Sequence, residues 1–268
     1  MIQYIIKDIT LKMGIQGKYM IRKLLLLTML LGATLFASTI NIAVAANVSY
    51  AIDELKTAFK QQHPDVKVRV TLGSSGKLTA QIKNGAPYTL FMAANMKYPE
   101  ALYEDKIAIT KPVVYAQGAL AYLSKKGRDF SNPASLLQSD AITKIAIANP
   151  KTAPYGKAAL EAFTNMKIVD AIESKFVYGE SISQTVSYAI TAADIGLIAK
   201  SSLYSPQMAE YKADVNWKEV DTSYYKPIKQ GIVILKNAKD NKDVKALYDF
   251  MLSTEAKSIL KKFGYVVD

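Results

Sequence analysis

The sequence predicts an α/β fold of two lobes joined by a two-strand hinge, and three observations support this prediction. Strand-like and helix-like segments alternate after residue 37, which is typical of sheets covered by helices. A second alternating series of the same kind begins near residue 144. Two extended segments, near residues 114–117 and 225–230, separate the two series. A chain that crosses over and later returns makes two lobes with a cleft between them.

The first lobe is predicted from residues 38–114 and 228–268, and the second from residues 115–227. Apolar spacing of two residues indicates strands, and spacing of three to four residues indicates helices. In the first lobe these patterns predict strands at residues 38–46, 66–72 and 88–94, and helices at residues 48–63, 77–87 and 98–106. We expect a largely parallel sheet in each lobe, since helices separate the strands.

The second series follows the extended stretch at residues 113–127. Its predicted elements are strands at residues 144–150, 175–179 and 195–203, and helices at residues 155–166 and 181–192. Another extended stretch, residues 217–237, leads to one long final helix, residues 243–264, closed by Gly264. The chain therefore ends in the lobe where it began.

The first 37 residues are typical of a targeting segment and not of the folded lobes. From Met20 a basic start is followed by an apolar run that is too short to span a membrane, and small residues close it at Ala37. This pattern predicts a secretory signal peptide. Residues 1–19 do not fit such a peptide, so we expect translation to start at Met20, with the preceding residues an upstream extension of the reading frame.

Composition excludes several chemistries. The chain has no cysteine, which excludes disulfides, thiolate metal sites, a cysteine nucleophile and a lipid-anchored cysteine. Its formal net charge is +11, and +7 remains after residue 37, from 29 basic and 22 acidic residues. Such a surface suits an anion. Nucleic acid is not expected as a partner of an exported protein, and the lysines are not clustered with aromatic residues.

Small and hydroxyl residues gather where three predicted strands meet helices. The three stretches are AANVSYA with Asn47 and Ser49, LGSSGKL with Ser74 and Ser75, and ANPKTAPYGKA with Pro154 and Gly156. The first N–H groups of a helix lack intrahelical partners and lie at the positive end of the helix dipole, so these junctions suit an anion. Serine and asparagine are also ordinary helix caps. The residues alone predict a two-lobed binder of something small, with an anion as one candidate.

Four longer stretches extend this prediction: AANVSYAIDELKTAFK, GSSGKLTAQIKNGAPYTLFMAAN, NPKTAPYGKAALEAF and ADIGLIAKSSL. In order and spacing they resemble the periplasmic molybdate-binding proteins of ABC transporters, over essentially the whole chain after residue 37. The resemblance implies the type II periplasmic binding protein fold. One departure is Thr89, where the family pattern has aspartate.

The resemblance also implies the residues of the site. In this family a tetrahedral oxyanion is held by neutral donors, hydroxyl and main-chain N–H groups, from both lobes. Matched by motif, the residues that contact the metal oxyanion fall on Asn47, Ser75, Tyr155 and Ile182, with Ser49 and Ser74 as secondary candidates. Some members have a tyrosine where this chain has Ala199, and Tyr155 replaces their alanine, so we expect the two differences to compensate.

By the same resemblance, we expect a periplasmic protein that captures molybdate or tungstate and delivers it to the membrane permease of an ABC transporter. No cofactor, no catalytic residue and no enzymatic activity are expected, and the protein is expected to be a monomer. Lys77, beside the proposed site, is expected to be a bystander in solvent.

Another oxyanion, ferric iron and serine hydrolysis remain as alternatives. Iron-binding proteins of this fold use a tyrosine pair, but Tyr224 and Tyr225 are neighbours in an extended stretch and would point to opposite faces. A hydrolase would need His63, the only histidine, as its base, and that residue falls in a predicted surface turn. The GSSG stretch also differs from the G-x-S-x-G nucleophile elbow.

The signal peptide yields the first testable prediction. N-terminal sequencing of the exported protein is expected to begin near Ser38, because small residues end the apolar run there. A mature protein that retains residues 20–37 would show that this segment is an uncleaved anchor instead.

Overall fold

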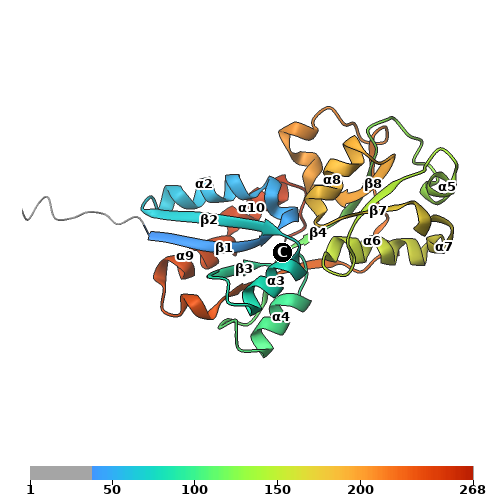
Figure 1. The fold of residues 1–268 in the computed structure, drawn as a ribbon. Helices are drawn as coiled ribbons and strands as arrows, with labels where there is room; N and C mark the ends of the chain where they lie inside the picture. Colours follow the sequence, from blue (N-terminus) through green and yellow to red (C-terminus); the bar gives the residue numbers. More distant parts are fainter. Residues whose placement is uncertain (1–37, 268) are drawn as a thin grey trace, which may run out of the picture. The chain divides into compact units, whose positions relative to one another are not determined.

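The computed structural model describes residues 38–267, and the predicted signal peptide and upstream extension lie outside these residues. Two five-stranded sheets form the described part of the chain. Helices cover both faces of each sheet (Figure 1). The predicted α/β class is therefore confirmed.

The first sheet has the strand order β2-β1-β3-β10-β4. Its strands are β1 (Ser38–Ala45), β2 (Val66–Gly73), β3 (Leu90–Met92), β4 (Val113–Gly118) and β10 (Ile228–Ile234). Strand β1 pairs in parallel with β2 and β3, whereas β10 pairs antiparallel with β3 and β4. The sheet is mixed, so the expectation of a largely parallel sheet is wrong for the strands where the chain crosses over and returns.

Alternation along the strands explains how this sheet is covered. One face carries α2 (Ile52–Gln62), α9 (Lys242–Met251) and α10 (Thr254–Lys262), and the other carries α3 (Ser75–Lys83) and α4 (Lys97–Glu104). Within β1, Ile42 and Val44 are buried with Leu55 of α2, whereas Ala43 is buried with Leu78 of α3. Both faces of β1 are apolar because both are covered by helices.

The second sheet has the order β7-β6-β8-β5-β9 and is also mixed. Its strands are β5 (Leu120–Leu123), β6 (Ile145–Ala148), β7 (Phe176–Gly179), β8 (Ile195–Ala199) and β9 (Trp217–Glu219). The helices are α5 (Pro133–Gln138), α6 (Pro154–Asn165) and α7 (Val169–Ile172), which pack on one face, and α8 (Ile182–Thr191), which packs on the other.

Short 3-10 helices complete the described chain: η1 (Ala46–Tyr50), η2 (Glu173–Lys175), η3 (Lys200–Tyr204), η4 (Pro206–Met208), η5 (Thr222–Tyr224) and η6 (Lys236–Ala238). The first of these corrects the predicted helix at residues 48–63. The turn at η1 is wound more tightly, with Ala51 donating its N–H to the carbonyl of Val48, and the α-helix starts only at Ile52. The tight turn buries Ala46, Asn47 and Val48 at the end of β1.

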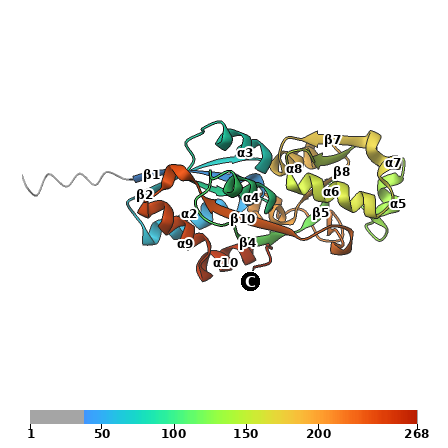
Figure 2. The same ribbon diagram turned by 90° about the horizontal axis from the view of Figure 1, so that it is seen from below.

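The two sheets are connected where the extended segments were predicted (Figure 2). The chain leaves the first sheet after Gly118 at the end of β4 and enters β5 at Leu120. It returns between β9 and β10, and β10 pairs with β4, with a β-bulge between Gln230 and Gly231. The predicted lobe boundary between residues 114 and 115 falls inside strand β4. The exact limits of the two lobes stay a prediction.

The predicted final helix is wrong in one respect, because two helices occupy residues 243–264. Helix α9 ends at Met251, and α10 begins at Thr254 with Ser253 as its N-cap. The Ser253 hydroxyl oxygen accepts a hydrogen bond from the Ala256 N–H at 3.2 Å, which ends one helix and starts the next. Gly264 closes α10 as predicted, with a φ of 75°.

Replacement of the cap tests this break. Ser253→Ala is expected to lower the free energy of unfolding by about 1 kcal/mol, because the Ala256 N–H loses its acceptor. Urea denaturation measures the change. Ser258→Ala is the matched control: this serine is exposed within α10, and the substitution should leave stability unchanged or slightly raise it. Equal losses in both variants would contradict the assigned cap.

Candidate functional site

Ser75 is the first residue of α3 and is fully buried. Its hydroxyl oxygen accepts a hydrogen bond from the main-chain N–H of Ala94 at 2.9 Å. Because that bond occupies the oxygen as an acceptor, the hydroxyl proton is left to donate elsewhere. The preceding residue, Ser74, is also buried, and its hydroxyl has no partner within the protein. Both serines of the GSSG stretch therefore hold unused hydrogen-bonding capacity.

The glycine after these serines allows α3 to approach the second sheet. The N–H of Gly76 donates to the carbonyl of Thr152 at 2.9 Å, in the loop before α6. A Cβ atom at residue 76 would lie 2.9 Å from that carbonyl and 2.8 Å from the Tyr98 hydroxyl. Since side chains do not tolerate such contacts with a backbone atom, the start of α3 meets this loop only because residue 76 is glycine.

Tyr155 lies in the first turn of α6 and is 1% exposed. Its hydroxyl oxygen accepts a hydrogen bond from the side-chain amide nitrogen of Gln230, in β10, at 3.1 Å. Burial, together with the neighbouring tyrosines, raises the pKa of Tyr155 well above its ordinary value. The hydroxyl therefore keeps its proton at neutral pH. As at Ser75, the oxygen accepts from an N–H group and the proton is free to donate.

Asn47 is fully buried in η1, and its side-chain nitrogen is already engaged. Nδ2 donates to the Gln230 amide oxygen at 2.9 Å and to the Tyr265 hydroxyl at 3.1 Å, which uses both of its hydrogens. Oδ1 has no partner. In this arrangement the side chain has no N–H left for an anion. Asn47 can donate through its main-chain N–H, since the first N–H groups of a helix lack intrahelical partners.

Ile182 is the first residue of α8 and is 4% exposed. Its neighbour Ser183 donates its hydroxyl to the carbonyl of Ala46 at 2.8 Å, and the hydroxyls of Ser49 and Ser183 lie 3.1 Å apart. These bonds hold the start of α8 against η1. Ser49 thus bonds to α8, which packs on the second sheet, and this bond helps to hold η1 beside α8.

The predicted residues of the two sheets are brought together by these contacts. Gly76, next to Ser75, bonds to Thr152, three residues before Tyr155. The Gln230 side chain bonds to both Tyr155 and Asn47. Ser183, next to Ile182, bonds to Ala46, next to Asn47. One buried cluster includes Ala46, Ala94, Tyr155 and Ile182. The starts of α3, α6, α8 and η1 therefore converge on one enclosed, neutral region rich in N–H and O–H groups.

Three buried residues of this region escaped the sequence analysis: Tyr115, Gln230 and Tyr265. The Tyr265 hydroxyl donates to the carbonyl of Asn47 at 2.8 Å, and burial raises the pKa of Tyr265 to about 12. A signal for Gln230 did exist. In β10, Ile228, Gln230 and Ile232 alternate onto one face, so a polar amide occupies a position where the pattern calls for an apolar residue.

Lys77 lies at the edge of this region and is not only a bystander. Its side chain is 57% exposed, as expected for a residue in solvent, but its ammonium group lies 3.2 Å from the Glu180 carboxylate before α8. The pair joins a residue of α3 to one that precedes α8. With Ser74, Ser181 and other residues, Lys77 and Glu180 line a pocket of about 210 Å³.

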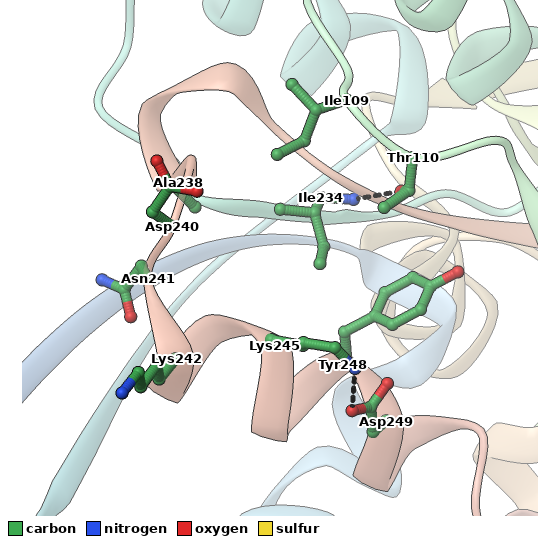
Figure 3. Close-up of a pocket in the computed structure, with 10 residues that line it drawn as sticks. All are labelled: Ile109, Thr110, Ile234, Ala238, Asp240, Asn241, Lys242, Lys245, Tyr248 and Asp249. Atoms are coloured by element: carbon green, nitrogen blue, oxygen red, sulfur yellow. Dashed lines mark hydrogen bonds and ion pairs between the residues drawn. The ribbon is translucent and has the colours of Figure 1, made fainter.

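A larger pocket, of about 360 Å³, lies between β10 and α9 (Figure 3). None of the predicted site residues lines it. Its apolar part includes Ile109 and Ile234, and its charged part contains the Lys245–Asp249 ion pair. The side-chain oxygen of Asn241 accepts from two main-chain N–H groups at the start of α9. Its polar groups are therefore largely paired with one another, and it is a weaker candidate than the region around Ser75 and Tyr155.

The structure does not favour iron or hydrolysis. The Tyr225 hydroxyl accepts a hydrogen bond from the Leu120 N–H at 3.1 Å in the core, so it does not form a free pair with Tyr224. His63 stacks on Phe59, with ring centroids 4.6 Å apart, whereas the Ser75 hydroxyl is bonded to the Ala94 N–H and not to an imidazole. Within residues 38–267 no cluster of three His, Cys, Asp or Glu side chains could hold a metal ion. No helix in the same range has both the length and the apolar character required to cross a membrane.

The structure shows the surroundings of both departures from the family pattern. Ala199 and Tyr155 belong to the same buried cluster, and the expected compensation between them stays a prediction. Thr89 donates its hydroxyl to the carbonyl of Asn41 at 2.9 Å and thereby ties the start of β3 to β1. Its role in this structure is to connect two strands.

Comparisons with known proteins agree with the two-sheet α/β fold. A family model described as bacterial extracellular solute-binding protein matches residues 40–266. The molybdate-binding protein ModA of Azotobacter vinelandii is 33% identical over 238 residues, which is 88% of this chain and 93% of that protein. The ModA protein of Rhodobacter capsulatus is 33% identical over 87% of this chain and 90% of its own length.

The same similarity is seen among solved structures. The Azotobacter vinelandii periplasmic molybdate-binding protein superimposes with a TM-score of 0.78 at 30% identity, and the match covers 85% of this chain and 99% of that one. The family model, which matches residues 40–266, likewise includes the strands of both sheets.

Proposed function

Because the chain belongs to the bacterial extracellular solute-binding protein family, we propose that it captures molybdate or tungstate at the candidate site and delivers the anion to the permease of an ABC transporter. Similar proteins named as molybdate-binding support the choice of ligand. The anion is the cargo, and no cofactor or enzymatic activity is part of the proposal. The extracytoplasmic location rests on the family and on the predicted signal peptide.

The observation that carries the proposal is the state of the two buried hydroxyls. Ser75 and Tyr155 each accept a hydrogen bond from an N–H group, so each has a proton to donate. Main-chain N–H groups at the starts of α3, α6 and α8 add further donors, with Ile182 contributing from α8. A dianion that loses its water on burial needs several such donors, because charge-assisted hydrogen bonds replace its hydration.

A neutral site also suits the role of a carrier. Asn47, Ser75, Tyr155 and Ile182 carry no charge, so anion and site form no buried ion pair. A cage of fixed donors favours an anion large enough to contact all of them, and we therefore propose molybdate or tungstate over the smaller sulfate and phosphate. A different oxyanion remains the alternative, and the ligand panel below decides between them. The expected monomeric state and the absence of a nucleic-acid partner stay predictions.

Thermal stability in the presence of ligands tests the proposal directly. Melting temperature is measured with molybdate, tungstate, sulfate, phosphate or ferric citrate. A ligand at a thousandfold excess over Kd stabilises the folded state by about 4 kcal/mol, which corresponds to a rise of about 10 °C for a chain of this size. We expect this rise with molybdate or tungstate. A rise with sulfate, phosphate or ferric citrate alone would replace the proposed ligand, and no rise with any of them would refute the site.

Two substitutions test the assigned donors. Ser75→Ala and Tyr155→Phe are each expected to weaken molybdate binding about tenfold or more, because each removes one hydrogen bond to a charged ligand. Calorimetric titration measures Kd. Ser258→Ala and Tyr178→Phe are matched controls, since both side chains are exposed to solvent, and they should bind as the wild type does. Wild-type affinity in both site variants would show that the site is assigned wrongly.

A further inference from the structure

Gln230 is the buried residue that joins most of the candidate site together. It is fully buried in β10, and its amide makes three side-chain hydrogen bonds. Oε1 accepts from Asn47 Nδ2 at 2.9 Å and from the Tyr115 hydroxyl at 2.8 Å, while Nε2 donates to the Tyr155 hydroxyl at 3.1 Å. The partners come from η1, β4 and α6. One amide therefore connects both sheets and two of the predicted ligand-binding residues.

The orientation of this amide fixes the direction of the bond to Tyr155. Its oxygen is turned toward two donors, so its nitrogen faces Tyr155. Nε2 can only donate, so the Tyr155 oxygen must accept, and its own proton has to point away from Gln230. Burial keeps that proton in place, because it raises the pKa of Tyr155 well above its usual value.

The backbone around Gln230 is shaped for this contact. The β-bulge between Gln230 and Gly231 interrupts the pairing of β10 with β4. On the partner strand, Gly118 ends β4 opposite Ile228, and a Cβ atom there would collide with the Tyr155 hydroxyl and lie 2.7 Å from the Gln230 amide nitrogen. The absence of a side chain at residue 118 leaves the space in which the tyrosine from α6 reaches the amide from β10.

We propose that Gln230 is a positioning residue that orients the Tyr155 hydroxyl as a hydrogen-bond donor to the bound oxyanion, an inference that rests on the proposed function. Gln230 does not touch the anion in this proposal. It acts through Tyr155, and the bond to Tyr155 forms only when α6 lies against β10. The same amide thus couples the packing of α6 against β10 to the orientation of the Tyr155 hydroxyl.

The test is a double-mutant cycle on the full-length protein, with Kd for molybdate measured by calorimetric titration. Gln230→Met removes the donor without adding charge and is expected to weaken binding about tenfold. In the Tyr155→Phe background the same substitution is expected to cost about twofold or less, because the hydroxyl that it orients is absent. Gln117→Met, on the partner strand β4, is the matched control and should bind as the wild type does.

A second variant keeps the proposal falsifiable if Gln230→Met does not fold. Gln230→Glu preserves the size and the two accepting bonds from Asn47 and Tyr115, but an ionised carboxylate cannot donate to Tyr155. Tyr155 would then donate to the carboxylate and present no proton to the anion. We expect Gln230→Glu to weaken binding more than Gln230→Met does, and circular dichroism of the ligand-free variants reports their folding.

The outcomes separate this inference from the function on which it rests. If wild type binds molybdate and Gln230→Met costs the same factor with and without the Tyr155 hydroxyl, Gln230 has only a structural role and the proposal is overturned. Wild-type affinity in Gln230→Glu, measured at a pH above the pKa of the new carboxyl group, would overturn it as well. If wild type binds neither molybdate nor tungstate, the proposed function is wrong and this inference falls with it.

Discussion

The site depends on one constraint: polar groups buried between the two sheets must find hydrogen-bond partners. A buried hydroxyl or amide without a partner lowers the free energy of unfolding by about 1–3 kcal/mol. A polar region between the two sheets is therefore stable only when most of its groups are hydrogen-bonded to one another. Gln230 supplies the centre of that network, and Tyr265 supports it from the end of the chain. The network leaves unused the protons of Ser75 and Tyr155, the hydroxyl of Ser74 and the acceptor oxygen of Asn47. An incoming anion thus meets donors that the protein cannot satisfy by itself.

Local patterns in the sequence predicted most of the fold. Strands and helices of both series follow from apolar patterns, since central strands such as β6 and β8 are buried on both faces, the edge strand β2 alternates, and the helices bury one face. One missed signal is equally local but was outweighed by periodicity. Ser253 is a serine cap inside an apolar helical pattern, and the pattern alone suggested one continuous helix. The antiparallel strands β4 and β10 result from the crossing of the chain between sheets, which no short stretch encodes.

For the candidate site, the sequence located the junctions but not the connections between them. Residues at helix starts, such as Ser75, can be recognised from their type and position, because the first N–H groups of a helix lack intrahelical partners. Gln230 and Tyr265 lie 183 and 218 residues from Asn47 along the chain, so no local pattern relates them. The assignment of Asn47 as a ligand-binding residue came from the family resemblance, matched by motif. Its side-chain hydrogens are used within the protein, which only the packed arrangement reveals.

The contacts that hold the two sheets together are individually weak, and this bears on how a carrier works. An exposed pair such as Lys77–Glu180 contributes about 0–1 kcal/mol, and a hydrogen bond such as that from Gly76 to Thr152 contributes about 1 kcal/mol. Contacts of this size do not commit the chain to one arrangement, so a ligand that bridges α3 and α6 can decide between arrangements through its differential affinity. Strong direct contacts would hold the sheets together without cargo. Weak contacts around a set of unused donors therefore suit the proposed carrier, in which the bound anion bridges α3 and α6.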